Sequence, residues 1–105
     1  MAKSEWQIIF DYRQAIRQAD KLDDIANRVD KIAKDKMNNM MTALKSSWQS
    51  DNSAQFCSKM KQVQSDIISD GNQIRKIADA IRTTAEGIKN AELRALEIAK
   101  CREYR

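Results

Sequence analysis

The chain has 105 residues, with no proline, no histidine and two glycines. This length allows one domain at most, and the shortage of turn-forming residues argues against barrels, sheets and Rossmann-type units. Without histidine, the commonest general base near neutral pH and the commonest metal ligand are both missing. Hydrophobic residues make up 42% and charged residues 32%, which is too apolar for a disordered tail. We therefore expect an all-α protein that is not an enzyme and holds no cofactor or metal.

The charge is mixed along the chain. Nineteen basic and fifteen acidic side chains leave a net charge of +4, and Lys31, Lys34 and Lys36 alternate with Asp30 and Asp35. A nucleic-acid binder usually carries a one-sided basic stripe. The even spread predicts solvated helix faces and no nucleic-acid partner.

The start of the chain, residues 1–10, lacks the apolar core and cleavage site of a secretory signal peptide. No stretch approaches the roughly 20 apolar residues that cross a bilayer. We expect a protein that folds in the cytoplasm without stable membrane insertion, unless another export route takes it.

The first helix is predicted over about residues 5–45. Ser4 and Gln7 have the spacing of a capping box at its start. From Ile8, steps of four and three give a heptad seam in which only Lys36 is polar. The seam contains Ile8, Tyr12, Ala15, Ala19, Leu22, Ala26, Val29, Ala33, Lys36, Met40 and Ala43. A flanking row contains Ile9, Ile16, Ile25, Ile32, Met37, Met41 and Leu44.

A turn is predicted over about residues 46–52, where serine, aspartate and asparagine cluster around Trp48. These small polar side chains compete for backbone hydrogen bonds and favour caps and turns. Ser50, Asp51 or Asn52 is the candidate cap of the next helix. Asn52 and Gln55 also have the reciprocal capping spacing.

The second helix is predicted over about residues 53–102. Its apolar run includes Phe56, Met60, Val63, Ile67, Gly71, Ile74, Ala78, Ile81, Ala85 and Ile88. Gly71 and Gly87 each cost about 1 kcal/mol in a helix interior. Either a neighbouring backbone comes close there, or the helix bends, or a well-supported helix tolerates them.

The two cysteines are 44 residues apart on this helix, about 66 Å at 1.5 Å per residue, and cannot pair within it. Cys57 is expected in the core and Cys101 as an exposed thiol.

A short connection between long helices predicts an antiparallel two-helix hairpin. Because a helix depends mostly on packing of its apolar face, such wide stripes predict a dimer that forms a four-helix bundle. The core and dimer stripe is expected to contain Ile8, Tyr12, Leu22, Val29, Met40, Leu44, Met60, Val63, Ile67, Ile74, Ile81 and Ile88.

Three details near the stripe have alternative interpretations. Lys36 either disfavours self-pairing or extends its stem to the surface. Trp6 and Phe10 are expected to close the bundle end against Leu93 and Leu96, although Trp6 could equally mark an interface edge. The methionines near the turn fill the core or form an adaptable docking patch; they are Met37, Met40, Met41 and Met60.

The turn Trp48-Gln49-Ser50, between two long amphipathic helices, resembles the W-x-G turn of the WXG family of type VII secretion substrates, with Ser50 in place of glycine. Leu44 and Ser47 before it and Ala54 and Phe56 after it also fit the family pattern, and the likeness covers nearly the whole chain.

The resemblance implies a small secretion substrate, or an accessory partner of a larger secreted effector, that leaves the cytoplasm without a cleavable signal peptide. Its implied partners are a second copy, another WXG-like protein or the N-terminal helical region of an effector, together with the type VII membrane ATPase. Trp48, Ser50 and Phe56 are the implied site residues. Trp48 is either a plug of the bundle end alone or also part of the surface that the ATPase reads.

One departure concerns the family's export signal, a tyrosine followed four residues later by an acidic residue. Tyr104 is followed only by Arg105, and Tyr12 has Ile16 at that spacing. A partner supplies the signal, or residues beyond Arg105 have been removed, or the signal is a variant. The alternative function is a generic cytoplasmic coiled-coil adaptor with no secretion role, and a helical nucleic-acid binder is a third.

Overall fold

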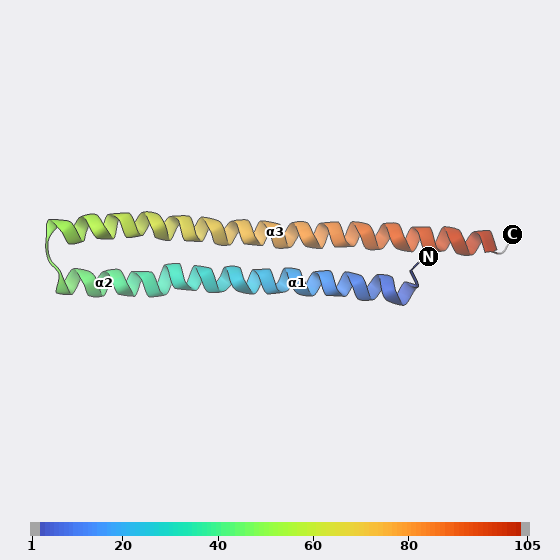
Figure 1. Ribbon diagram of the computed structural model, residues 1–105, viewed down its shortest axis with the longest axis horizontal. Coiled ribbons are helices and arrows are strands. Elements are labelled where there is room, and N and C mark those ends of the chain that lie inside the picture. The colour runs from blue at the N-terminus through green and yellow to red at the C-terminus, as the bar shows by residue number, and fades with distance from the viewer. Residues whose placement is uncertain (1–2, 104–105) are drawn as a thin grey trace. The chain divides into compact units, whose positions relative to one another are not determined.

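The structure is a computed structural model that describes residues 3–103; Tyr104, considered above for the export signal, lies outside these residues. It contains α1 (Glu5–Lys31), a π-helical turn η1 (Ile32–Lys36), α2 (Met37–Ser47) and α3 (Asp51–Glu103) (Figure 1). Only residues 3–4 and 48–50 of the described chain are not helical. The expectation of an all-α protein is therefore confirmed.

The helices pack in two compact units. In the turn unit, Asp23–Arg75, the chain reverses after α2, so that the first part of α3 lies antiparallel to the end of α1, η1 and α2 (Figure 1). In the terminal unit, described over residues 3–22 and 76–103, the start of α1 packs antiparallel to the second part of α3. Each unit is a two-helix pair.

The space between the paired helices is filled mainly by small side chains. In the turn unit the buried residues include Ala26, Ala33, Ser53, Cys57 and Gly71. In the terminal unit they are Ile8, Ala19 and Ala78. No large side chain among the described residues is fully buried. Small contact residues let helices approach closely, but they leave the large apolar side chains on the flanks of each pair.

The π-helical turn η1 changes which residues of the first helical segment face α3. The N–H of Met37 donates to the carbonyl of Ile32, five residues earlier, so one extra residue enters the turn. Met37 and Met41 are buried as a result, whereas Met40 is 45% exposed and Lys36 is exposed. The expectation that the seam continues through Lys36 and Met40 is wrong for the core of this chain, because the heptad count assumes an uninterrupted α-helix.

Gln64 of α3 stabilises this irregular turn. Its side-chain amide donates to the carbonyl of Ala33 and to Oδ1 of Asn38, the latter at 2.8 Å. Because η1 takes the N–H of Met37 to Ile32, the carbonyl of Ala33 lacks its ordinary helical donor. The side chain of Gln64 supplies a donor in its place.

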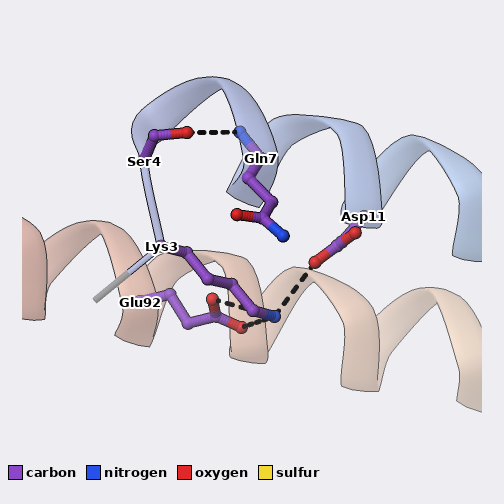
Figure 2. Close-up of polar contacts among 5 residues, drawn as sticks. All are labelled: Lys3, Ser4, Gln7, Asp11 and Glu92. Atoms are coloured by element: carbon purple, nitrogen blue, oxygen red, sulfur yellow. Dashed lines mark hydrogen bonds and ion pairs between the residues drawn. The ribbon is translucent and has the colours of Figure 1, made fainter. Parts of the chain in front are cut away.

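The start of α1 is fixed by two local contacts. The predicted cap is present, since the N–H of Gln7 donates to Oγ of Ser4 at 3.2 Å (Figure 2). Lys3 lies between two carboxylates, with Nζ 3.0 Å from Asp11 and 3.4 Å from Glu92 of α3. The hydrogen bond with Asp11, followed by that with Glu92, raises the pKa of Lys3 above 10.5.

Neighbouring atoms limit the space for a side chain at Gly71, whereas the space at Gly87 is open. A Cβ at Gly71 would lie 2.9 Å from Oδ1 of Asp30 and 3.6 Å from the carbonyl of Ala26. A Cβ at Gly87 would meet nothing within 4 Å. The group that comes close at Gly71 is therefore the Asp30 carboxylate, while the neighbouring backbone lies at ordinary contact distance; Gly87 is tolerated in a long helix.

Candidate functional site

The turn at Trp48 is built without any left-handed residue. Trp48 ends α2 with an extended backbone, φ −134° and ψ 91°, and its N–H donates to the carbonyl of Leu44 at 2.8 Å. No residue in the described chain has a positive φ. Since glycine is needed where φ is positive, this turn accepts Ser50 without backbone strain.

Ser50 and Ser53 cap the start of α3 reciprocally. The N–H of Ser53 donates to Oγ of Ser50, and the N–H of Ser50 donates to Oγ of Ser53, both at 3.3 Å. The Ser53 hydroxyl also donates to the carbonyl of Ser50 at 2.8 Å. Of the three candidate caps, the structure selects Ser50, with Ser53 as its partner in place of the Asn52–Gln55 pair. A serine at the third helical position is a less usual partner than Glu or Gln, which explains why the motif was missed.

Trp48 and Phe56 form an aromatic pair beside this cap. Their ring centroids are 6.5 Å apart and the rings are tilted by 49°. Trp48 is 42% and Phe56 41% exposed, so neither ring is enclosed by its own chain. The three implied site residues Trp48, Ser50 and Phe56 are thus together at one turn, with both aromatic side chains partly exposed.

One flank of each helix pair is polar. In the turn unit, a guanidinium nitrogen of Arg75 contacts the carboxylate of Asp30 and donates to Oδ1 of Asn27, the latter at 2.8 Å. In the terminal unit, Arg82 of α3 forms an ion pair with Asp20 of α1 at 2.8 Å. These contacts lie between the two helices of each pair and define the side that we call the ion-pair flank.

The opposite flank is apolar. Adjacent residues on a helix point about 100° apart. Val29 directly precedes Asp30, and Ile74 directly precedes Arg75. These two apolar side chains therefore lie on the side of the helix pair away from the Asp30–Arg75 ion pair. By the same geometry, Ile25 and Ile32 of the first helical segment and Phe56 and Val63 of α3 also lie on this flank. All four are between 41% and 46% exposed. We call this side the apolar flank.

In the terminal unit, the apolar flank is hollow. A pocket of about 470 Å³ lies between α1 and α3. Ile8, Tyr12 and Ala15 form its α1 side, and Ile77, Ala80, Ile81, Thr84, Ala85 and Ile88 line it from α3. Its polar rim includes Lys3, Asp11 and Glu92, and Lys89, whose Nζ lies 4.3 Å from the centroid of the Tyr12 ring. We call this hollow the terminal groove.

The predicted stripe residues separate into three levels of burial. Ile8 is buried. The half-buried members are Tyr12, Leu22, Val29, Leu44, Met60, Ile67, Ile74 and Ile81. Met40, Val63 and Ile88 are exposed, at 45%, 44% and 53%. The exposed members are not part of the core of this chain, and their contact with a partner stays a prediction.

Trp6 and Phe10 are placed differently from the expectation that they close the bundle end. Their rings stack at 5.2 Å with an interplanar angle of 15°, but Trp6 is 72% and Phe10 44% exposed. This chain therefore does not bury them against Leu93 and Leu96. The contact of Trp6 with a partner at an interface edge stays a prediction.

The described residues show no group of three or more His, Cys, Asp or Glu side chains that could hold a metal ion. Cys57 is buried and Cys101 is exposed, as expected. Within residues 3–103, no helix has the length and apolar character needed to cross a membrane.

Comparison with known proteins adds no assignment, because no protein-family model, curated protein or solved structure matches this chain.

Proposed function

We propose that this chain is an interaction protein whose apolar flank packs against a second helical hairpin to form a four-helix bundle. The observation that supports this most strongly is the distribution of side-chain size. Alanine, glycine, serine and cysteine fill much of the space between the helices, while Ile25, Ile32, Phe56, Val63 and Ile77 remain exposed. Burying such side chains is the main source of helix stability in water.

The exposed area of the chain supports the same proposal. A compact monomer of this mass is expected to expose about 6,000 Å², whereas the chain exposes 8111 Å². The excess of about 2,000 Å² is in the range that each member of a permanent dimer buries. A partner that covers the apolar flank would account for this area.

We further propose that the bundle is a small type VII secretion substrate, or the accessory partner of a larger secreted effector, that presents the Trp48 turn to the membrane ATPase. It would fold in the cytoplasm and leave without a cleavable signal peptide. The half-exposed Trp48–Phe56 pair supports this role, because aromatic side chains on a rigid support are frequent anchors of protein recognition.

The secretion role is tested by Trp48→Ala in the producing cell. Because the Ser50–Ser53 cap is independent of the indole, the variant should keep its helicity while export falls by about tenfold or more. Trp6→Ala is the matched control, since it removes an even more exposed tryptophan far from the turn in sequence. Unchanged export of Trp48→Ala would remove this residue from the recognition surface.

The second candidate is a cytoplasmic coiled-coil adaptor in which Trp48 only covers the end of the helix pair. The tilted contact between the Trp48 and Phe56 rings favours the adaptor function, because such a contact would stabilise the end of the helix pair. In that case Trp48→Ala would lower the thermal midpoint of unfolding, and the protein would stay in the cell whatever residue occupies position 48.

A further inference from the structure

One face of α1 in the terminal unit carries two aromatic and three basic side chains. Because successive residues of a helix point about 100° apart, five side chains lie about 140–220° around the axis from the buried side chain of Ile8. They are Trp6, Phe10, Arg13, Arg17 and Lys21. All five are exposed. We call this face, which points away from α3 in the terminal unit, the outer row.

The three cations of the outer row have no acidic partner on the chain. Within residues 3–103, Arg13, Arg17 and Lys21 form no ion pair. They follow one another at intervals of four residues, where like charges on a helix repel and destabilise it. An anionic partner would relieve this repulsion.

The acidic side chains of the same stretch of α1 do not compensate the positive charge. Asp11 contacts Nζ of Lys3 at 3.0 Å (Figure 2). Asp20 contacts Arg82 of α3 at 2.8 Å. Glu5 lies outside the outer row, by about 80° around the helix axis. The even count of charges along the sequence therefore does not reveal this one-sided basic face.

The aromatic pair at the start of the outer row presents a flat apolar surface. The rings of Trp6 and Phe10 stack at 5.2 Å with an interplanar angle of 15°. Trp6 is 72% exposed, so its ring is open to a further planar group. A base of a nucleic acid is such a group, and bases stack on aromatic side chains whatever their sequence.

A single strand of nucleic acid fits the outer row better than a membrane or an acidic peptide does. A helix that lies on a bilayer buries an apolar face along its length and keeps its cations on the other face, whereas here the cations and the aromatic rings share one face. An acidic peptide would use the cations without needing flat rings. A single strand uses both, because its phosphates pair with cations while its bases stack.

We propose that the outer row binds a single strand of nucleic acid, with a base stacked on Trp6 and phosphates paired with the three cations. Double strands bind less well, because their bases are already stacked on one another. The side chains of the row donate hydrogen bonds but accept none, so the contact tolerates any base sequence. The outer row is not part of the apolar flank, and the inference is therefore independent of the proposed dimer.

The proposal is tested with the Trp48→Phe variant, in which Trp6 is the only tryptophan. A short oligothymidylate should quench the Trp6 fluorescence, because a base stacks on the indole. Anisotropy of a labelled strand should give a plot of log association constant against log salt concentration with a slope of about −2, as expected for three phosphate contacts on a single strand. Absence of binding at low salt would overturn the proposal.

Two variants separate the charges from the ring, with anisotropy as the readout. Arg17→Gln should reduce the slope to about −1.4. Trp6→Leu should keep the slope but weaken binding by about fivefold or more. Arg94→Gln is the matched control, since it removes an exposed cation from α3 in the same unit and should change neither quantity. An unchanged slope in Arg17→Gln, or unchanged affinity in Trp6→Leu, would overturn the proposal.

The other anionic partners are tested in competition with the same labelled strand. Polyphosphate and polyglutamate carry charge without bases, and both should compete at least tenfold less well than unlabelled oligothymidylate at equal charge concentration. Equal competition by either polymer would show that charge alone is recognised and would overturn the stacking contact. Phosphatidylglycerol vesicles that displace the strand and shift Trp6 emission to the blue would assign the outer row to a membrane surface instead.

Discussion

Ser50 shows how a turn accommodates a serine where glycine would offer more freedom. Its backbone does not enter the left-handed region, so the freedom of glycine has no use here. Its hydroxyl instead satisfies the N–H of Ser53 at the start of α3. Ser50, which stands where the W-x-G pattern has glycine, therefore fixes where α3 begins.

Ser50→Ala should lower the free energy of unfolding by about 1 kcal/mol, because the N–H of Ser53 loses the hydroxyl acceptor and keeps only the carbonyl of residue 50, at 3.1 Å. Ser50→Gly should cost only a few tenths of a kcal/mol. Urea unfolding followed by circular dichroism, at one fixed protein concentration, measures both. A variant with glycine that is clearly more stable than the wild type would contradict the turn geometry described above.

The effect of a substitution at Gly71 depends on the neighbouring ion pair between Asp30 and Arg75. Alanine in place of a helical glycine gains about 1 kcal/mol, but at Gly71 the added Cβ would displace the carboxylate of Asp30 from Arg75. We expect Gly71→Ala to be neutral or destabilising, and Gly87→Ala to stabilise by up to about 1 kcal/mol.

The same urea titrations test this difference. The Asp30→Ala variant is used as a second background, because it removes the carboxylate that a Cβ at Gly71 would meet. In that background, Gly71→Ala should become stabilising. If the two glycine variants behave alike when Asp30 is present, close approach is not the reason for Gly71.

At the scale of the element, η1 decides which methionines reach the core. One extra residue between Ala33 and Met41 moves the buried positions to Met37 and Met41 and leaves Met40 outside. The element depends on Gln64, whose amide donates to the carbonyl that the π-helical turn leaves without its helical donor. A local irregularity of the first helical segment is thus stabilised by a side chain from α3.

Gln64→Leu should destabilise the protein by about 1–3 kcal/mol, because the carbonyl of Ala33 then has no donor. Gln62→Leu is the control, since Gln62 is exposed and a surface substitution is expected within about 0.5 kcal/mol. Thermal unfolding of the two variants side by side measures the difference. Equal midpoints would show that η1 does not depend on Gln64.

The start of α1 should respond to alkaline pH through Lys3. Asp11 first, and Glu92 second, raise the pKa of Lys3 above 10.5. A raised pKa means that the contact is fully present below pH 10.5 and is lost as the pH rises through the folded value. In an NMR titration, the Lys3 Nζ signal should titrate at higher pH in the wild type than in Asp11→Asn. Coincident titration curves would contradict the contact between these two side chains.

At the scale of the whole molecule, the sequence predicted the helical class, the reversal near Trp48 and the cap at Ser4, because these follow from local composition and spacing. It did not predict η1 or the role of Gln64, since the hydrogen bond from Gln64 to Ala33 joins residues 31 positions apart. It placed Met40 in the seam because a heptad count assumes a regular helix. The heptad count could not distinguish Val63 and Ile88, which are exposed, from Ile8, which is buried.

The placement of Trp48, Ser50 and Phe56 at one turn followed from their closeness in sequence. The terminal groove was not predicted, because it depends on which small residues of α1 and α3 lie opposite each other. The proposed dimer would supply packing for the large side chains that each helix pair leaves outside. If two chains associate as proposed, folding and association are coupled, and the unfolding midpoint should rise with protein concentration.

We propose that one chain leaves more apolar surface exposed than a stable monomer tolerates. Sedimentation equilibrium of the purified chain, over a hundredfold range of concentration and with helicity followed in parallel, tests it most directly. We expect a helical species of twice the 12.1 kDa chain mass, with helicity lost together with the dimer on dilution. A species of 12.1 kDa that stays fully helical and cooperatively folded at every concentration would contradict it.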